Sequence, residues 1–363
     1  MIWRALHTRC LRAALACVTL VACGSQPALS ADDWPAVPGA VFALRTADIT
    51  QPVVAFDTKG RALLGFNAEA RGRGLVGRSY DLVCDGGWFH ASGAGPWIGR
   101  SVTESGAFTV ELTLTPAVTS PSGDGVVLAF ENDEAESMAL LQRQDGLVLR
   151  VKGECMPLFA VEAKRPIHGL VTCGNGRWTA YRDGRLMNAG PLPDDAASWG
   201  EKQLVLGAAL SGKAHWRGRI EGIAVFSRAL TPEEATAEAV ASKHDERKPA
   251  RQVRFRGALV RQAPTADVLE IRPYTRSLTA AEYRVEEILD GEWTEPTITV
   301  LHWMVMDGQR LPLADRPPGA AVTLTVERLE DHPQLESSRR DEITDGNVTA
   351  EVFYCESEPA APH

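Results

Sequence analysis

Residues Trp216–Glu234 read WRGRIEGIAVFSRALTPEE, and this stretch decides the fold. Its first half alternates along Ile220–Val225 with the period of two residues that is typical of a β-strand. Gly218 permits a close approach of the backbone to its neighbours. The second half has the pattern of a helix start, because Thr231 is an N-cap residue followed by proline and two acids. The stretch therefore predicts a strand that leads into a short helix.

The chain before this stretch, from about Val41 to Arg228, has an all-β pattern. Short alternating segments at 108–115, 125–130, 146–151, 178–182 and 203–207 are separated by Gly, Asp, Asn and Pro. The pairs Asp183-Gly184 and Asp145-Gly146 accept the positive backbone angles of hairpin turns. Many short strands with such turns predict a sandwich or a barrel.

Two motifs carry a family resemblance. The string WTAYRDGR at 178–185 resembles a hairpin of laminin-G-like, concanavalin A-like jelly rolls, and 216–234 is similar to the closing strand of that family. The string CDGGWFH at 84–90 looks like its opening strand. The resemblance covers about residues 75–240 and implies a jelly-roll sandwich. These motifs serve packing and capping, so they identify a fold that lectins, adhesins, glycosidases and lyases share, and they identify no active site.

The C-terminal part, about Arg254–Cys355, is also rich in predicted strands. Segments 283–289, 298–305 and 321–327 form a meander with turns at Asp290-Gly291 and Asp307-Gly308. The order of strands resembles small Greek-key barrels of the OB type. The predicted fold class is therefore mainly β: a concanavalin A-like/laminin-G jelly-roll sandwich followed by a smaller β-rich domain, an OB-like barrel.

The N-terminus predicts export. Three arginines and no acid accompany the apolar run Leu11–Ala22, which is too short for a spanning helix and is typical of a signal peptide. The run ends in Leu20-Val21-Ala22-Cys23-Gly24, which looks like a bacterial lipobox with Cys23 as the lipidated residue. Gly24 resembles the outer-membrane sorting pattern. The alternative is ordinary cleavage near Ala28–Ala31, which would give a soluble periplasmic or secreted protein.

Composition divides the chain further. The charged, proline-containing stretch SKHDERKPARQ is typical of a linker, and the small polar residues before Pro38 are typical of a tether. The predicted parts are a lipoprotein signal peptide at 1–22, a flexible tether at 23–40, the sandwich at 41–241, the linker at 242–252, the C-terminal β-rich domain at 253–356 and a tail at 357–363.

Charge and cysteine content limit the partners. The formal net charge of −9 becomes −12 without residues 1–22, because these hold three arginines and no acid. A nucleic-acid partner is not expected of so acidic a chain. Four cysteines remain beyond Cys23, and the two closest in sequence, Cys155 and Cys173, are the favoured disulfide in an oxidising compartment. The alternative is that some are small buried hydrophobes without a bond.

The acidic run Glu131–Glu136 is the candidate catalytic segment. Its glutamates and Asp133 superficially match the acid/nucleophile strand of concanavalin-fold glucanases, which need two carboxylates about 5 Å apart. In those enzymes the intervening residues are apolar, whereas here they include Asn132 and Glu134. Because burying Glu134 unpaired is costly, the run is interpreted as an acidic loop and no enzyme activity is expected.

Rim loops offer the remaining candidate sites. Laminin-G-like relatives often bind calcium there, and Asp124, Asn132 and Asp133 are oxygen donors at suitable places, so calcium is the one cofactor considered. Trp97 and Trp199 stand in loop-like contexts rich in Gly, Pro, Ser and Asp, where an exposed ring would suit a pyranose face. The alternatives are a solvated acidic loop and a packing role for both rings.

The resulting hypothesis is a cell-envelope lipoprotein of the outer membrane that binds polysaccharide or glycoprotein without cleaving it, with a link to exopolysaccharide modification or export. The alternatives are a scaffold or adhesin that holds envelope proteins together, and a glycosidase or lyase of the same fold.

Overall fold

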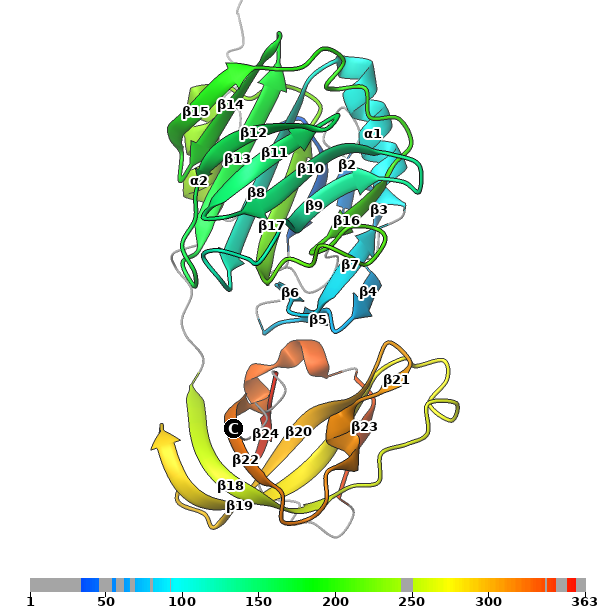
Figure 1. Ribbon diagram of the computed structural model, residues 1–363, viewed down its shortest axis with the longest axis vertical. Helices are drawn as coiled ribbons and strands as arrows, with labels where there is room; N and C mark the ends of the chain where they lie inside the picture. The colour runs from blue at the N-terminus through cyan, green and yellow to red at the C-terminus, as the bar shows by residue number, and fades with distance from the viewer. Residues whose placement is uncertain are drawn as a thin grey trace, which may run out of the picture.

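The computed structural model describes residues 34–45, 54–56, 62–65, 69–78, 81–91, 93–242, 251–336, 338–343 and 351–356. The chain forms a large sandwich, at the top of Figure 1, and a smaller barrel below it. Three sheets and few helices make the fold mainly β, as predicted.

The first sheet of the sandwich holds the stretch that decides the fold. Its strands lie in the order β15 (Arg185–Pro191), β14 (Arg177–Arg182), β13 (Ile167–Gly174), β8 (Phe108–Pro116), β17 (Gly218–Phe226), β1 (Ala40–Arg45), β2 (Val54–Phe56), β3 (Ala62–Gly65), with β6 (Leu82–Cys84) on β17 and β5 (Leu75–Val76) on β6. β17 is therefore paired along both edges, with β8 on one side and with β1 and β6 on the other.

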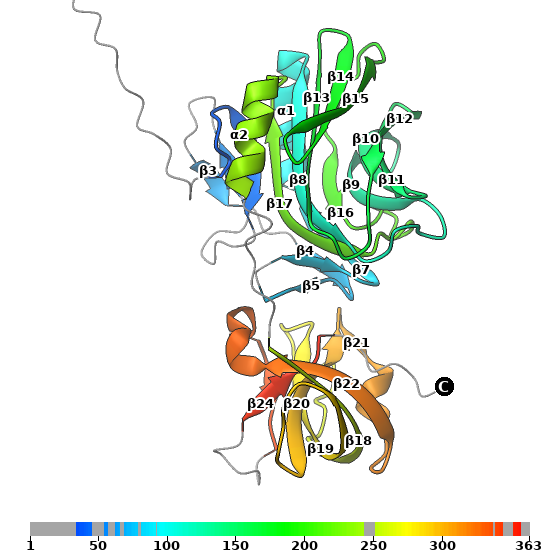
Figure 2. The ribbon, with the colours of Figure 1, turned by 90° about the vertical axis from the view of Figure 1, so that its left-hand side faces the viewer.

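The second sheet lies face to face with the first, as Figure 2 shows from the side. Its strands lie in the order β12 (Glu154–Ala160), β11 (Gly146–Val151), β10 (Glu136–Arg143), β9 (Gly125–Glu131), β16 (Gln203–Leu206), β7 (Gly87–Ala91), β4 (Glu69–Gly72). One apolar cluster fills the space between the sheets, and Trp178 and Trp216 are buried in it. Two facing sheets with this filling are the predicted jelly-roll sandwich.

Helix α2 (Pro232–Ser242) follows β17 as predicted. Its start is a capping box, because the Thr231 hydroxyl accepts the N–H of Glu234 at 3.3 Å and the Glu234 carboxylate accepts the N–H of Thr231 at 2.9 Å. The other helix of the sandwich, α1 (Ala94–Ser105), buries Ile98 and Val102 against the core.

One hairpin is built differently from the prediction. Asp183-Gly184 forms the turn between β14 and β15 with φ of 51° and 73°, as expected. Between β10 and β11 the turn is instead Gln144-Asp145, with φ of 51° at Gln144, and Gly146 already pairs with Arg143. The register places the turn one residue earlier than the Asp-Gly pair suggested.

Residues 34–40, predicted as part of a flexible tether, pack on the sandwich. The Trp34 indole N–H donates to Glu111 on β8 at 2.6 Å, and the N–H groups of Ala36 and Val37 donate to Glu238 on α2 at 2.9 and 2.8 Å. Glu111 also contacts His168 on β13 at 2.7 Å. Figure 2 shows α2 on the outer side of the first sheet, so this polar cluster lies between helix, sheet and N-terminal segment.

The C-terminal part is a closed barrel. Its strands are β18 (Gln252–Gln262), β19 (Ser277–Asp290), β20 (Thr297–Met306), β22 (Ala321–Arg328) and β24 (Val352–Tyr354), with β21 (Gln309–Arg310) and β23 (Arg340–Asp341) at its margins and three short 3-10 helices at Pro312–Asp315, Leu329–Asp331 and Pro333–Leu335. Pairing runs β18-β19-β20-β24-β22 and back to β18, with β20 and β24 parallel. This five-stranded barrel agrees with the predicted Greek-key type.

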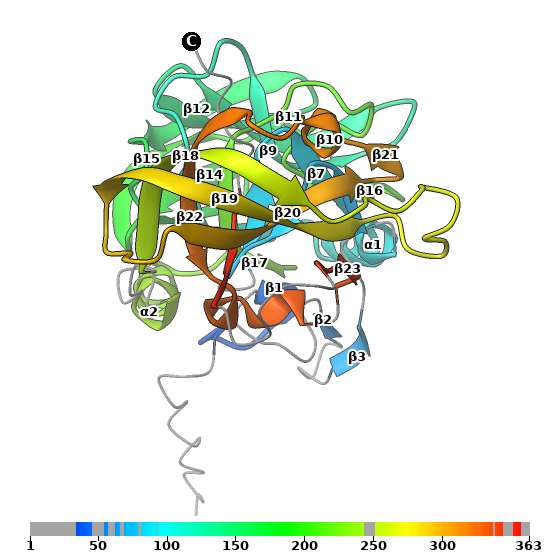
Figure 3. The same ribbon diagram turned by 90° about the horizontal axis from the view of Figure 1, so that it is seen from below.

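The two domains share an apolar contact. Leu75 and Val83 of the sandwich lie in one cluster with Leu301, Trp303 and Met306 of the barrel. Figure 3, from below, shows the barrel strands crossing in front of the sandwich. Polar bonds surround the cluster: Arg276 donates to the carbonyl groups of Gly72 and Gly74, Asp307 accepts the N–H of Gly72 at 2.9 Å, and Arg219 pairs with Glu356. The domains are therefore held in one arrangement.

We predict that this contact makes the domains unfold together. Leu75→Asp places a carboxylate in the cluster, so we expect differential scanning calorimetry to show two separate transitions instead of one. Val76→Asp is the matched control, because Val76 is 39% exposed and should leave the single transition intact. Two transitions in the unchanged protein would contradict the prediction.

A second prediction concerns Glu238. Burial, and then the charge of Glu111, raise the pKa of Glu238 to about 8, and Glu234 on the same helix adds to the rise against the two backbone N–H groups. Because the folded state binds this proton more tightly than the unfolded state, its stabilising effect is present below the unfolded pKa of 4.5 and is lost as the pH rises through about 8.

The free energy of unfolding, measured with denaturant, should therefore fall by roughly 1–3 kcal/mol between about pH 5 and pH 8 through this group. Glu238→Gln should remove that slope, whereas Glu233→Gln, an exposed change on the same helix, should keep it. An unchanged slope in Glu238→Gln would show that another group titrates.

Candidate functional site

The outer face of the second sheet carries a line of polar side chains from β7 to β11, interrupted between His90 and Arg150 by the buried residues Val205, Ala129 and Ala139. Strand register places His90 on β7 beside Val205 on β16, and Ala139 on β10 beside Arg150 on β11. Two residues further along β16 and β9, on the same face, Gln203 pairs with Glu131, and Glu131 pairs with Glu136 on β10. Since neighbouring strands lie about 4.8 Å apart, the line from β7 to β11 spans about 19 Å across the strands. We call His90, Gln203, Glu131, Glu136, Arg150, Arg143 and Asp124 the polar strip.

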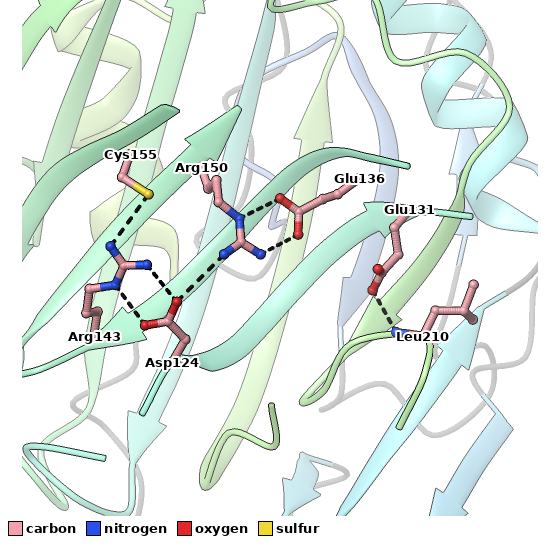
Figure 4. Close-up of polar contacts among 7 residues, drawn as sticks. All are labelled: Asp124, Glu131, Glu136, Arg143, Arg150, Cys155 and Leu210. Carbon is pink, nitrogen blue, oxygen red and sulfur yellow. Dashed lines mark hydrogen bonds and ion pairs between the residues drawn. The ribbon is translucent and has the colours of Figure 1, made fainter. Parts of the chain in front are cut away.

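Two arginines organise one end of the polar strip, shown in Figure 4. Arg143 donates to both oxygens of Asp124 at 2.7 and 2.6 Å, and Arg150 donates to both oxygens of Glu136 at 2.7 and 2.6 Å. Arg150 also lies 3.7 Å from Asp124, which links the two pairs. The hydrogen bond from Arg143 lowers the pKa of Asp124. The fork geometry fixes both guanidinium planes.

Glu131 lies in the middle of the polar strip, at the end of β9. Its carboxylate accepts the N–H of Leu210 at 2.6 Å, from the loop between β16 and β17. Burial raises the pKa of Glu131, as does the charge of Glu136, while the Leu210 N–H and Arg150 act in the opposite direction. The predicted acidic loop is therefore shorter than expected, because Glu131 and Glu136 belong to strands and only 132–135 connect them.

Two aromatic side chains lie on β7, at the opposite end of the polar strip. The Trp88 and His90 rings of β7 have centroids 6.1 Å apart, and His90 hydrogen-bonds to Gln203. Trp88 is half-buried and packs against the apolar cluster of the sheet's outer face. A flat ring beside polar groups is a surface that suits a sugar ring.

The two predicted sugar-binding tryptophans do not reach this face. Trp199 is 1% exposed, packs on Phe108 and Phe130 in the core, and donates its N–H to the Ala196 carbonyl, so the prediction that it contacts a ligand is wrong. Trp97 lies on helix α1 instead of in a loop. It is half-buried, and its N–H donates to the Val41 carbonyl at 3.1 Å, which indicates the packing role.

The predicted calcium ligands are not brought together. Asp124 lies just before β9 and Asn132 just after it, about 26 Å apart along an extended strand. Both oxygens of Asp124 are engaged by Arg143, and the Asn132 side-chain oxygen accepts from Lys202 at 2.8 Å and from the N–H groups of residues 134 and 135. Asp133 is exposed beside them. Cationic partners do not fit a calcium site, and the described residues contain no group of three metal-ligating side chains.

The predicted disulfide is also wrong. Cys155 is exposed on β12, where Arg143 donates to its Sγ at 3.6 Å, whereas Cys173 is buried on β13 of the other sheet. Cys84, Cys155 and Cys173 are free thiols, and burial raises the pKa of Cys173. Cys23, the predicted lipidation residue, lies outside the described residues. Among those residues no helix is long and apolar enough to cross a membrane.

The barrel does not offer its usual ligand face. OB-type barrels bind oligomers on the face of their second and third strands, here β19 and β20. That face carries Leu278, Ala280, Leu301 and Trp303, and they pack in the cluster shared with the sandwich. His302 points the other way, is 1% exposed and hydrogen-bonds to the Tyr283 hydroxyl at 3.0 Å, and burial lowers its pKa to about 3. The polar strip is therefore the better candidate site.

Sequence reasoning missed Arg143, Arg150, Trp88, His90 and Gln203. The available signal was strand alternation for Trp88, His90 and Arg150, because each lies between two buried residues, whereas Arg143 and Gln203 stand at the ends of their strands. Alternation alone identifies the outward-facing residues of each strand. Only the register shows which of these residues on β7 to β11 are neighbours.

Comparison with known proteins supports the fold of the sandwich. Residues 92–236 match the model of a laminin-G family described as the concanavalin A-like lectin/glucanases superfamily, which confirms the resemblance. No curated protein sequence matches the chain.

Solved structures with related folds are distant. Trypanosoma rangeli sialidase in complex with sialic acid has 15% identity and a TM-score of 0.40 over 56% of this chain, which spans only 33% of that chain. The binding domain of botulinum neurotoxin DC, in complex with rat synaptotagmin II, has 9% identity and a TM-score of 0.45 over 78% of this chain and 77% of its own. The pentraxin of Limulus polyphemus has 16% identity and a TM-score of 0.29 over 36% of this chain and 68% of its own. TM-scores this low say nothing about what this chain binds.

Proposed function

We propose that the sandwich binds a polysaccharide or glycoconjugate along the polar strip and does not cleave it. The observation that supports this most is the register of the strip: Gln203, Glu131 and Glu136 follow each other on adjacent strands, with Arg150 and His90 reaching in from the next position. A line of about 19 Å perpendicular to the strands matches a linear polymer better than a small molecule. The family to which residues 92–236 are matched includes lectins.

The hydrogen bonds of the carboxylates favour binding over hydrolysis. A retaining glycosidase needs one carboxylate free to attack and another free to donate a proton. Both oxygens of Glu136 are held by Arg150, and Glu131 accepts a backbone N–H. These contacts orient the groups as fixed hydrogen-bonding partners for a ligand.

A glycosidase is the second candidate, on one specific observation. Glu131 and Glu136 are register partners on adjacent strands, and their mutual charge contributes to the raised pKa of Glu131. A close carboxyl pair with one raised pKa is the arrangement that acid catalysis uses.

We predict that Arg150→Ala and Trp88→Ala each weaken the affinity for a polysaccharide that the parent protein binds, by roughly fivefold to tenfold. Arg150→Ala removes a charged hydrogen bond, and Trp88→Ala removes a ring contact. Affinity electrophoresis against a panel of soluble polysaccharides measures this. Arg256→Ala, which removes an exposed, ion-paired arginine from the barrel, is the matched control and should bind as the parent does.

Two outcomes would contradict the proposal. Release of reducing ends by the parent, abolished in Glu131→Gln, would favour the glycosidase. If the protein binds none of the polysaccharides but binds an envelope protein tightly, the scaffold is favoured.

We also propose that the chain is exported and anchored to the outer membrane through lipid on Cys23. The sequence Leu20–Gly24 supports this, and no described residue bears on it. Cys23→Ala should move the protein from the membrane to the soluble fraction and abolish labelling by a fatty-acid probe. Cys17→Ala, within the same N-terminal segment, should change neither. Labelling that persists in Cys23→Ala would refute the anchor.

A further inference from the structure

We propose that the ligand of the polar strip is an uncharged, hydroxyl-rich polysaccharide and not a polyanion such as a polyuronate. This inference rests on the proposed function and names its ligand class. The supporting observation is that the cationic side chains of this face already contact oxygen acceptors of the protein itself.

Each arginine of the strip has its own carboxylate. Arg143 is held by Asp124 and Arg150 by Glu136, each through two hydrogen bonds of 2.6–2.7 Å. The four side chains are partly exposed, at 40%, 36%, 26% and 20% for Arg143, Asp124, Arg150 and Glu136. A polyanion could bind either arginine in this fork geometry only by displacing an intramolecular carboxylate that is already optimally placed.

Two neighbouring cations also contact oxygen acceptors. Lys202 contacts the Asn132 side-chain oxygen at 2.8 Å, and Arg71 on β4 pairs with Glu69 at 2.6 Å. Glu131 adds a carboxylate without a cation of its own. The face therefore presents no excess of positive charge, and the chain as a whole has a formal net charge of −9. Recognition of a polyanion depends on such an excess.

A hydroxyl group fits the paired array. Each guanidinium keeps N–H groups beyond the two that its carboxylate accepts, and each carboxylate keeps lone pairs beyond the two that it uses. A donor and an acceptor thus stand side by side at Arg143–Asp124 and again at Arg150–Glu136. A sugar hydroxyl both donates and accepts, so it can bond to both members of a pair without breaking it.

The experiment uses the purified full chain and two kinds of soluble probe, a neutral glucan or galactomannan and polygalacturonate, in affinity electrophoresis. We expect retention by a neutral polymer and none by polygalacturonate. Retention should change less than twofold between about 0.05 M and about 0.5 M NaCl, because no long-range charge attraction contributes.

Asp124→Asn gives the sharper test, since it releases Arg143 from its carboxylate. Affinity for the neutral polymer should fall by about fivefold to tenfold, and affinity for polygalacturonate should rise severalfold. Glu287→Gln is the matched control: it makes the same change in charge and frees Arg256 from a pair at 2.7 Å in the barrel, so it should alter neither affinity.

The failures are distinguishable. Retention of the parent by polygalacturonate that is lost at high salt, or a gain in Asp124→Asn no larger than in Glu287→Gln, would overturn the neutral ligand and leave the glycan-binding function standing. Retention by no polymer of either kind would overturn both.

Discussion

The position of one indole ring constrains the sandwich. Trp216, directly before β17, donates its N–H to Gln142 on β10 at 2.7 Å, so it joins the first sheet to the second through the core. Its ring lies over two glycines: a Cβ at Gly218 would come within 2.3 Å of the ring, and one at Gly125 within 3.2 Å. Gly218 therefore has to be glycine for the two sheets to approach as they do, whereas a side chain at Gly125 would require the ring to shift by a few tenths of an ångström.

The same contact explains the arrangement of the outer face. Trp216 fixes the end of the loop that runs from β16 to β17, and Leu210 in that loop donates to Glu131. Val126 pairs with His215 in the same loop. A packing constraint in the core thus determines which part of the outer face the loop covers, and it leaves the strands from β9 to β11 to carry the exposed arginine–carboxylate pairs.

The sequence predicts the parts of the fold that are local or that repeat with a short period. β17 follows from a period of two residues, and the N-cap at Thr231 and the Asp183-Gly184 turn depend on residues close together in sequence; all three agree with the structure. The small barrel could be predicted from its strand-rich pattern, but the meander expected of 283–289, 298–305 and 321–327 is wrong, because β24 lies between β20 and β22. The turn at Gln144 could not, because the register of β10 on β11 selects it over the better local turn sequence beside it.

The candidate site could not be predicted, because its chemistry depends on partners far apart in the chain. Trp199 has the local context of an exposed loop, yet the aromatic rings of Phe108 and Phe130, distant in sequence, bury it. Asp124 is a suitable calcium ligand by residue type and loop position. In the structure, however, Arg143 lies across the hairpin and donates to both of its oxygens. A carboxylate facing an arginine in fork geometry has lost its use as a metal ligand and gained one as half of a donor–acceptor pair. The pairing of β9, β10 and β11 therefore determines that these oxygen atoms accept from arginine side chains.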